Sequence, residues 1–142
     1  MKYLYPATFT SDDQDGYLVT FPDLPEAITQ GDDMSDARSN AIDALDEAVA
    51  AYAMDGKPLP SPSKTDRGQV LISVPLQTVL KYELRLTMKA GAVSNTELAK
   101  KIDVSEKEVR RIIDLGHNTS LARLETALLA MGKQPVVKLV AA

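Results

Sequence analysis

Apolar and polar side chains alternate along the first 31 residues, a pattern typical of half-buried strands. The alternation predicts a strand at residues 2–10 whose inner face carries Tyr3, Tyr5, Ala7 and Phe9. Residues 11–16 end in the turn sequence Asp-Gly and predict a hairpin to a second strand at residues 17–21. A short third strand is expected at residues 27–30. Pro6 predicts an edge strand or a bulge, because proline has no backbone N–H to donate.

Spacings of three and four residues replace the alternation after Ser35 and predict a helix at residues 36–54. Ser35 is the expected N-cap, and Gly56 is the expected C′ residue that ends the helix. The inward stripe consists of Ala37, Ala41, Ala44, Leu45, Ala48, Val49 and Tyr52. Three strands followed by one helix predict a small antiparallel sheet with the helix packed on one face.

Three prolines within residues 57–63 predict a stiff, extended connector. We therefore place an acidic α/β domain at residues 1–62 and expect a linker and a strand at residues 63–75. The alternation of Val70, Ile72 and Val74 predicts that this strand spans residues 69–74.

Residues 76–142 are expected to form an all-α domain, whose first helix runs from 76 to 90. A last apolar strand is predicted at residues 136–140, so that short strands flank the helical region. We expect this strand to pair with the one at residues 69–74, within the chain or across a dimer. The predicted dimer contacts are Val70, Ile72, Val74, Val137 and Leu139.

The most informative pattern is a pair of short helices predicted within residues 94–113. Ser94 with Glu97 and Ser105 with Glu108 are both capping boxes, each of which marks the start of a helix. Asp103-Val104 makes a tight turn between the two helices. Apolar residues face inward from both helices, and a further helix at residues 121–131 closes the bundle. This arrangement fits a helix-turn-helix.

The charges of the chain are strongly segregated along its 142 residues. The formal net charge is −4, but residues 1–66 carry 13 acidic and 4 basic residues, or −9. Residues 67–142 carry 7 acidic and 12 basic residues, or +5. This split indicates two surfaces for two kinds of partner.

The second helix of the two-helix pattern would enter the major groove of DNA, where Arg and Lys reach guanine edges or phosphates. Asn95 would bond a phosphate beside the free N–H groups at the start of the preceding helix. Glu106 and Glu108 would repel phosphates unless they cap the helix or read cytosine. The expected DNA contacts are Asn95, Thr96, Ser105, Glu106, Lys107, Arg110, Arg111, Asn118 and Thr119.

Composition excludes several other kinds of site. The chain has no cysteine, so disulfides and zinc–cysteine sites are excluded, and its single histidine, His117, rules out a multi-histidine metal site. No metal, cofactor or catalytic residue is therefore expected. No signal peptide or long apolar stretch is recognisable, so a cytoplasmic protein without a membrane partner is expected.

Residues 17–25, Tyr-Leu-Val-Thr-Phe-Pro-Asp-Leu-Pro, are followed by Thr-Gln-Gly-Asp at 29–32, an Ala-rich helix and a Pro-rich exit at 56–62. In order and spacing, this pattern resembles the HicB antitoxins. Residues beyond 62 resemble the Cro/repressor-type helix-turn-helix that one branch of the family carries. Together, the resemblance covers nearly the whole chain.

The resemblance implies an amino-terminal domain with a trimmed ribonuclease H-like fold. It also implies a protein partner, the HicA toxin, which is a small basic ribonuclease that the antitoxin occludes while it represses its own operon. An acidic domain suits such a partner by charge complementarity. The predicted toxin contacts are Asp12, Asp15, Asp23, Asp43, Asp46 and Glu47.

A ribonuclease H-like fold also raises the possibility of a nuclease, which we tested against the residues. Two-metal nuclease chemistry needs several carboxylates converging on metals roughly 4 Å apart. Asp12, Asp13 and Asp15 lie at a hairpin tip, where Asp is favoured for turn chemistry, and residues 3–9 contain no acid. The chain is therefore not expected to be an enzyme.

We expect an antitoxin and autorepressor whose partners are a HicA-type toxin, operator DNA and a second copy of the chain, as a dimer or a tetramer. Two alternatives remain open. One is a DNA-binding regulator whose amino-terminal domain senses a small ligand. The other is a protein-interaction adaptor whose helices never contact DNA.

Overall fold

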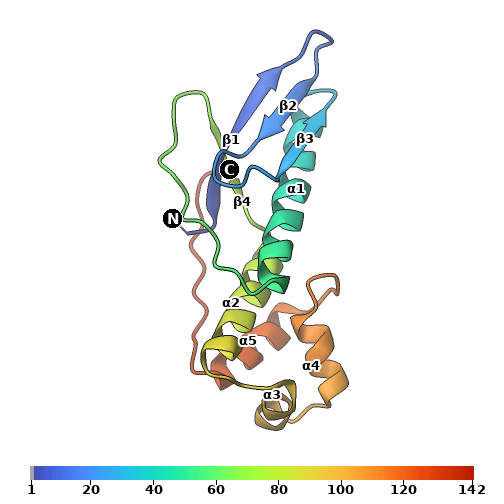
Figure 1. Cartoon of the computed structure of the whole chain (residues 1–142), viewed down its shortest axis with the longest axis vertical. Helices are drawn as coiled ribbons and strands as arrows, with labels where there is room; N and C mark the ends of the chain where they lie inside the picture. The colour runs from blue at the N-terminus through green and yellow to red at the C-terminus, as the bar shows by residue number, and fades with distance from the viewer. Residues whose placement is uncertain (1) are drawn as a thin grey trace. The chain divides into compact units, whose positions relative to one another are not determined.

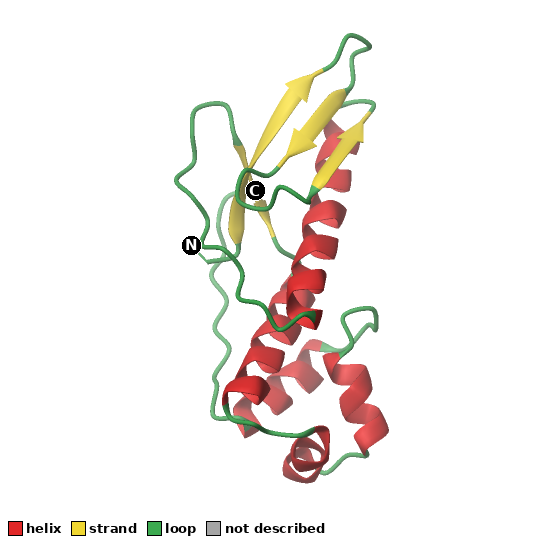
Figure 2. Cartoon of the chain, in the orientation of Figure 1, coloured by secondary structure: helices red, strands yellow, loops and turns green. Residues whose placement is uncertain are grey.

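The computed structural model describes residues 2–142. The chain divides into two compact units, of which one ends at Val79 and the other begins at Leu80. The first unit contains all the strands and one long helix, and the second unit is helical (Figures 1 and 2). The fold class is α+β, as the sequence predicts.

The first unit is built on a four-stranded antiparallel sheet in the order β3-β2-β1-β4. The strands are β1 (Leu4–Ser11), β2 (Tyr17–Thr20), β3 (Ile28–Gly31) and β4 (Val70–Ser73). The predicted hairpin forms with Thr8 opposite Thr20 and Ser11 opposite Tyr17. All three strands predicted in the first 31 residues are present, with bounds that shift by one or two residues.

Pro6 lies in a central strand, yet it costs the sheet no hydrogen bond. The Val74 N–H donates to the carbonyl of Tyr3 at 3.0 Å, so residues 3, 5 and 7 direct their backbone polar groups toward β4. Pro6 therefore directs its nitrogen to the opposite side, where pairing with β2 begins only at Thr8. The proline occupies a local edge, which is where a residue without an N–H fits.

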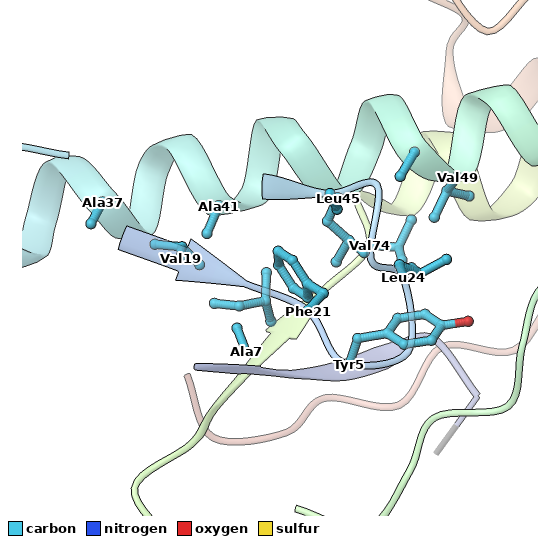
Figure 3. Close-up of a cluster of buried hydrophobic side chains, with 13 residues drawn as sticks. Tyr5, Ala7, Val19, Phe21, Leu24, Ala37, Ala41, Leu45, Val49 and Val74 are labelled. Atoms are coloured by element: carbon cyan, nitrogen blue, oxygen red, sulfur yellow. The ribbon is translucent and has the colours of Figure 1, made fainter. Parts of the chain in front are cut away.

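Helix α1 (Met34–Met54) packs on one face of this sheet, as the inward stripe predicts. Figure 3 shows large side chains from the strands and the following loop, among them Tyr5 and Phe21, between the sheet and Leu45 and Val49 of α1. Most of the predicted stripe is buried, although Ala44 and Tyr52 are only half-buried. Small alanines at 37 and 41 let the helix approach the sheet closely, and Gly31 allows the same at the end of β3.

The start of α1 differs from the prediction. Asp33, not Ser35, is the N-cap, because its side chain accepts a hydrogen bond from the Asp36 N–H at 2.8 Å. The Asp36 side chain in turn accepts from the Asp32 N–H at 2.9 Å, which fixes the helix start two residues earlier. The helix ends as predicted, with Gly56 in the left-handed region at φ 64°.

The predicted boundary at residue 62 is not where the compact units divide. Strand β4 pairs with β1, Leu4 opposite Ser73 and Ala7 opposite Val70, and so belongs to the first sheet. The proline segment is anchored as well: the Tyr5 hydroxyl donates to the Pro60 carbonyl at 2.7 Å, and the Ser63 N–H donates to Asp23 at 2.9 Å. A segment with alternating apolar side chains, such as residues 70–74, forms a strand only beside another strand, and the unpaired side of β1 provides that neighbour.

The second unit consists of the later part of α2 (Leu76–Ala90) and three shorter helices: α3 (Asn95–Ile102), α4 (Glu106–Ile113) and α5 (Leu121–Ala130). All four were predicted within one or two residues. Their inward residues form one aliphatic core, made of Leu80, Leu84, Met88, Leu98, Ala99, Val109, Ile112, Leu124, Ala127 and Leu128.

The predicted strand at residues 136–140 is absent: this segment has no regular secondary structure. Its apolar side chains are largely exposed, with Val136 at 86% and Leu139 at 90%. Within the chain, the segment therefore does not pair with residues 69–74, which pair with β1 as the outermost strand of the sheet. Alternation of apolar residues was insufficient here because a strand also needs a neighbour to accept its hydrogen bonds.

Candidate functional site

Helices α3 and α4 are held as a pair by their caps and by one tight turn. The Ser94 side chain accepts from the Glu97 N–H at 3.1 Å, and the Ser105 side chain accepts from the Glu108 N–H at 3.1 Å, so both predicted N-caps form. Asp103 adopts the left-handed conformation at φ 56° and ends α3. Only three residues therefore separate α3 from α4, and both helices bury their apolar faces in the same core.

The basic side chains of α4 lie on its outer face. Lys107, Arg110 and Arg111 are all exposed, and the side chains of the two arginines are 60% and 50% accessible. Val109 and Ile112 point the other way and are fully buried. The helix thus offers three cations to solvent without disturbing its packing.

The acidic residues of α4 are engaged within the unit. Glu106 accepts a hydrogen bond from the Thr96 hydroxyl at the start of α3 and lies 4.0 Å from Arg110. Glu108 lies 3.7 Å from Arg111 and 3.9 Å from Arg123 of α5. Glu106 therefore links the starts of two helices, and Glu108 partly neutralises Arg111. The net formal charge of α4 is +1.

The remaining predicted DNA contacts differ in how they are placed. Thr96, Asn118 and the N-cap Ser105 are exposed, whereas Asn95 and Thr119 are half-buried. Thr119 lies close to the end of α4, where its hydroxyl is 3.5 Å from the Arg111 carbonyl. The structure thus brings the predicted residues of α3, α4 and the following loop into one helical unit.

Sequence reasoning missed Lys81, a lysine with no exposed surface. Its ammonium group donates to the backbone carbonyls of Arg111, Asp114 and His117. Burial lowers the pKa of Lys81, and the nearby Asp114 carboxylate partly opposes this effect. A signal was present, because Lys81 precedes the inward residues Leu84 and Met88 by three and seven positions.

Three of the six predicted toxin contacts have structural partners inside the first unit. Asp12 accepts from the N–H groups of Gln14 and Gly16, both at 2.8 Å, and so shapes the hairpin turn. Asp23 binds Ser63, and Asp46 accepts from the Thr78 hydroxyl.

The other three predicted contacts, Asp15, Asp43 and Glu47, are exposed. Asp43 and Glu47 are four residues apart on α1, so they lie on the same face of the helix. Asp15 is at the hairpin tip with φ 65°. Among the predicted acids, this pair on α1 is the one whose carboxylates are most available to a partner.

The predicted dimer contacts separate into two groups. Ile72 and Val74 are 2% and 3% exposed in the core of the first unit, and the half-buried Val70 packs against it. Val137 and Leu139 are 54% and 90% exposed. The side chains of Ile72 and Val74 are thus used in the core of the first unit, whereas those of Val137 and Leu139 are accessible.

Residues 2–142 contain no group of three or more His, Cys, Asp or Glu side chains arranged to hold a metal ion. In the same described part of the chain, no helix has the length and apolar character needed to cross a bilayer.

Comparison with known proteins places the chain in context. A family model described as the HicB-like antitoxin of bacterial toxin–antitoxin systems matches residues 4–83. "Antitoxin HicB 2" of Photorhabdus laumondii is 38% identical over 129 residues, which is 91% of each chain. "Antitoxin HicB" of Escherichia coli K12 is 35% identical over 130 residues, covering 92% of this chain and 94% of that one. These similarities extend beyond the first unit into the helical one.

Proposed function

The chain belongs to the family of HicB-like antitoxins, a non-enzymatic family, and on this premise we propose that it neutralises a HicA-type toxin by direct binding and represses its own operon. The observation that carries the proposal is the similarity to antitoxins over more than nine-tenths of the chain. The two units divide the two tasks between them.

The charge of the first unit supports toxin binding. Its residues up to Val79 include 13 acidic and 5 basic side chains, a formal charge of −8. A basic ribonuclease would be steered toward such a surface. Asp43 and Glu47 of α1 are our proposed centre of the contact, because both are exposed and adjacent.

The second unit supports DNA binding. Its residues from Leu80 onward include 11 basic and 7 acidic side chains, a formal charge of +4. Helix α4 is the proposed recognition helix, with Lys107, Arg110 and Arg111 facing the DNA. The ordered caps of α3 and α4 leave backbone N–H groups near the two helix starts, where phosphate oxygens bind well.

Helix-turn-helix repressors act as dimers on half-sites about 34 Å apart, so we also propose a dimer. The segment 136–140 is the proposed contact, since its apolar side chains are exposed and it is not part of a helix or strand within the chain. A dimer formed this way would be symmetric, with the same segment contributed by both copies.

Toxin neutralisation is tested by co-expression with a HicA-type toxin and measurement of bacterial growth. The wild-type chain should restore growth and co-purify with the toxin. The variant Asp43→Asn with Glu47→Gln should bind the toxin more weakly, and the deficit should shrink as salt is raised. The matched control is Asp55→Asn with Asp66→Asn, which removes the same charge from exposed positions of the same unit. Equal binding by both variants would remove α1 from the contact.

Repression is tested by a gel-shift assay with the promoter of the chain's own operon at fixed salt. The wild-type chain should bind this DNA more tightly than an unrelated fragment of equal length. Growth rescue without promoter binding would assign the chain a protein-interaction role only.

A further inference from the structure

A buried cation donates hydrogen bonds to backbone carbonyls at the carboxy-terminal end of α4. An ammonium group has three N–H donors, and Lys81 has three acceptors: the carbonyls of Arg111 at 3.3 Å, of Asp114 at 2.6 Å and of His117. Burial of an unpaired charge is very costly, whereas a lysine whose three protons are all bonded can be tolerated inside a small domain. The three hydrogen bonds therefore explain why the ammonium group of Lys81 can be buried, with no exposed surface.

The three carbonyls belong to consecutive turns of one segment. Arg111 is in the last turn of α4, and Asp114 and His117 bound the turn that follows it. That turn is closed by the His117 N–H, which donates to the Asp114 carbonyl at 3.1 Å. The Asp114 side chain also accepts from the Gly116 N–H at 2.9 Å. Lys81 therefore joins the end of α4 to the loop that leads into α5.

A second cation from α2 acts on the same helix end. Arg85, one turn after Lys81, donates to the Ile113 carbonyl at 2.9 Å. The last carbonyls of a helix lack partners within the helix and carry the negative end of its dipole. Two cations on one face of α2 thus satisfy carbonyls from the last turn of α4 onward.

We propose that Lys81 and Arg85 are positioning residues for DNA recognition, an inference that rests on the proposed function of α4. They set the orientation of α4 and of residues 114–119, and so determine where Arg110, Arg111 and Asn118 meet the DNA. Lys81 does not act by touching a phosphate, because it is wholly enclosed and its charge is out of reach of the DNA.

Because Lys81 is enclosed, its loss can be distinguished from the loss of a phosphate contact. Loss of a phosphate contact lowers affinity and also reduces the salt dependence of binding, by about 0.9 in the slope of log K against log salt. Loss of a positioning residue lowers affinity through misplaced contacts. Lys81→Met should therefore lower operator affinity by about tenfold, the size expected when one base contact is misplaced. The slope of log K against log salt should change less in this variant than in a variant that has lost a phosphate contact.

A variant that merely loosens the core provides the control. Leu128→Ala removes a 3%-exposed side chain from the core of the same unit and leaves the carbonyls of Arg111, Asp114 and His117 bonded to Lys81. Operator binding is measured for wild type, Lys81→Met and Leu128→Ala at a temperature where all three are folded, at several salt concentrations. Equal affinity of Lys81→Met and Leu128→Ala would overturn the inference.

Amide hydrogen exchange without DNA separates this inference from the proposed function. Lys81→Met should accelerate exchange at Gly116 and His117 at least tenfold relative to Leu128→Ala, because these amides depend on the turn that Lys81 holds. Unchanged exchange there would overturn the inference even if operator binding is normal. Failure of the wild-type chain to bind its promoter, with accelerated exchange in the variant, would instead overturn the DNA-binding role. If Lys81→Met does not fold, Arg85→Met, which removes the bond to Ile113, replaces it in the operator-binding measurement.

Discussion

Arg110→Ala is the most direct test of the recognition helix. The Arg110 side chain is 60% accessible, and its one ion pair, with Glu106, is at the 4.0 Å limit. Such an exposed pair contributes about 0–1 kcal/mol, so little holds the guanidinium away from DNA. If Arg110 neutralises one phosphate, the substitution should reduce the slope of log K against log salt by about 0.9.

That slope can be converted into a change in affinity. Between 50 and 200 mM salt, one lost contact makes the ratio of wild-type to variant affinity fall by about 3.5-fold, since fourfold more salt raised to the power 0.9 gives this factor. If Arg110 instead contacts a guanine, the loss should be about 1–3 kcal/mol and confined to one operator position.

Arg111→Ala should have a smaller effect, for a reason visible in the structure. Arg111 is 3.7 Å from Glu108, which also lies 3.9 Å from Arg123, so DNA must compete with a carboxylate for this guanidinium. Glu108→Gln removes the competitor and should raise affinity by up to about fivefold, the equivalent of an exposed ion pair. In that background, Arg111→Ala should cost more than it does in the wild type.

The assay is a titration of fluorescent operator DNA by each variant at four or more salt concentrations, with thermal unfolding as the control for folding. Lys133→Ala, which alters an exposed cation outside the predicted set, is the matched control for loss of one positive charge. An unchanged slope for Arg110→Ala, or a larger effect for Arg111→Ala, would refute the geometry proposed for α4.

Three further predictions concern stability. Gly31→Ala should destabilise the first unit by about 3 kcal/mol, because the added Cβ would lie 2.2 Å from the Ala37 nitrogen. Urea unfolding measures the loss, and Gly91→Ala, whose Cβ would meet only ordinary contacts at 3.5 Å, should change stability by less than about 1 kcal/mol. A chain ending at residue 79 should unfold cooperatively in thermal circular dichroism. One ending at 64 should not, since it loses β4 with the buried Ile72 and Val74, worth about 3–6 kcal/mol together. Finally, the lowered pKa of Lys81 means that the unfolded chain binds more protons than the folded chain just below pH 10.5. The free energy of unfolding should therefore gain a rising contribution with pH in that window, and Lys81→Met should abolish this contribution in urea titrations at pH 8 and pH 10.

Local patterns predicted most of the elements because their causes are local. Ser94 and Ser105 each cap a helix through a hydrogen bond to the residue three positions on, and Gly56 ends α1 through its own backbone conformation. The inward stripe of α1 follows from helical spacing alone. The predicted outward direction of Lys107, Arg110 and Arg111 holds for the same reason, since Val109 and Ile112 are anchored in the core.

The partners of these elements could not be predicted in the same way. The alternation in Val70–Ser73 indicates a strand, but only folding decides that its neighbour is β1, some sixty residues earlier in the chain. The similar alternation near the carboxy terminus has no partner strand within the chain and is without regular structure. Strand pairing is a non-local event, and the side-chain pattern of one strand does not encode the other.

The sequence determined the net charge of each half of the chain, but not which charged side chains are accessible. The acidic and basic halves are fixed by composition, whatever the fold. Which carboxylates are available is a tertiary matter, since Asp23 and Asp46 are bonded within the first unit while Asp43 and Glu47 are exposed. Lys81 is the clearest case: its buried ammonium group is bonded to three carbonyls that lie thirty or more residues away in the sequence, and only the tertiary structure brings them together.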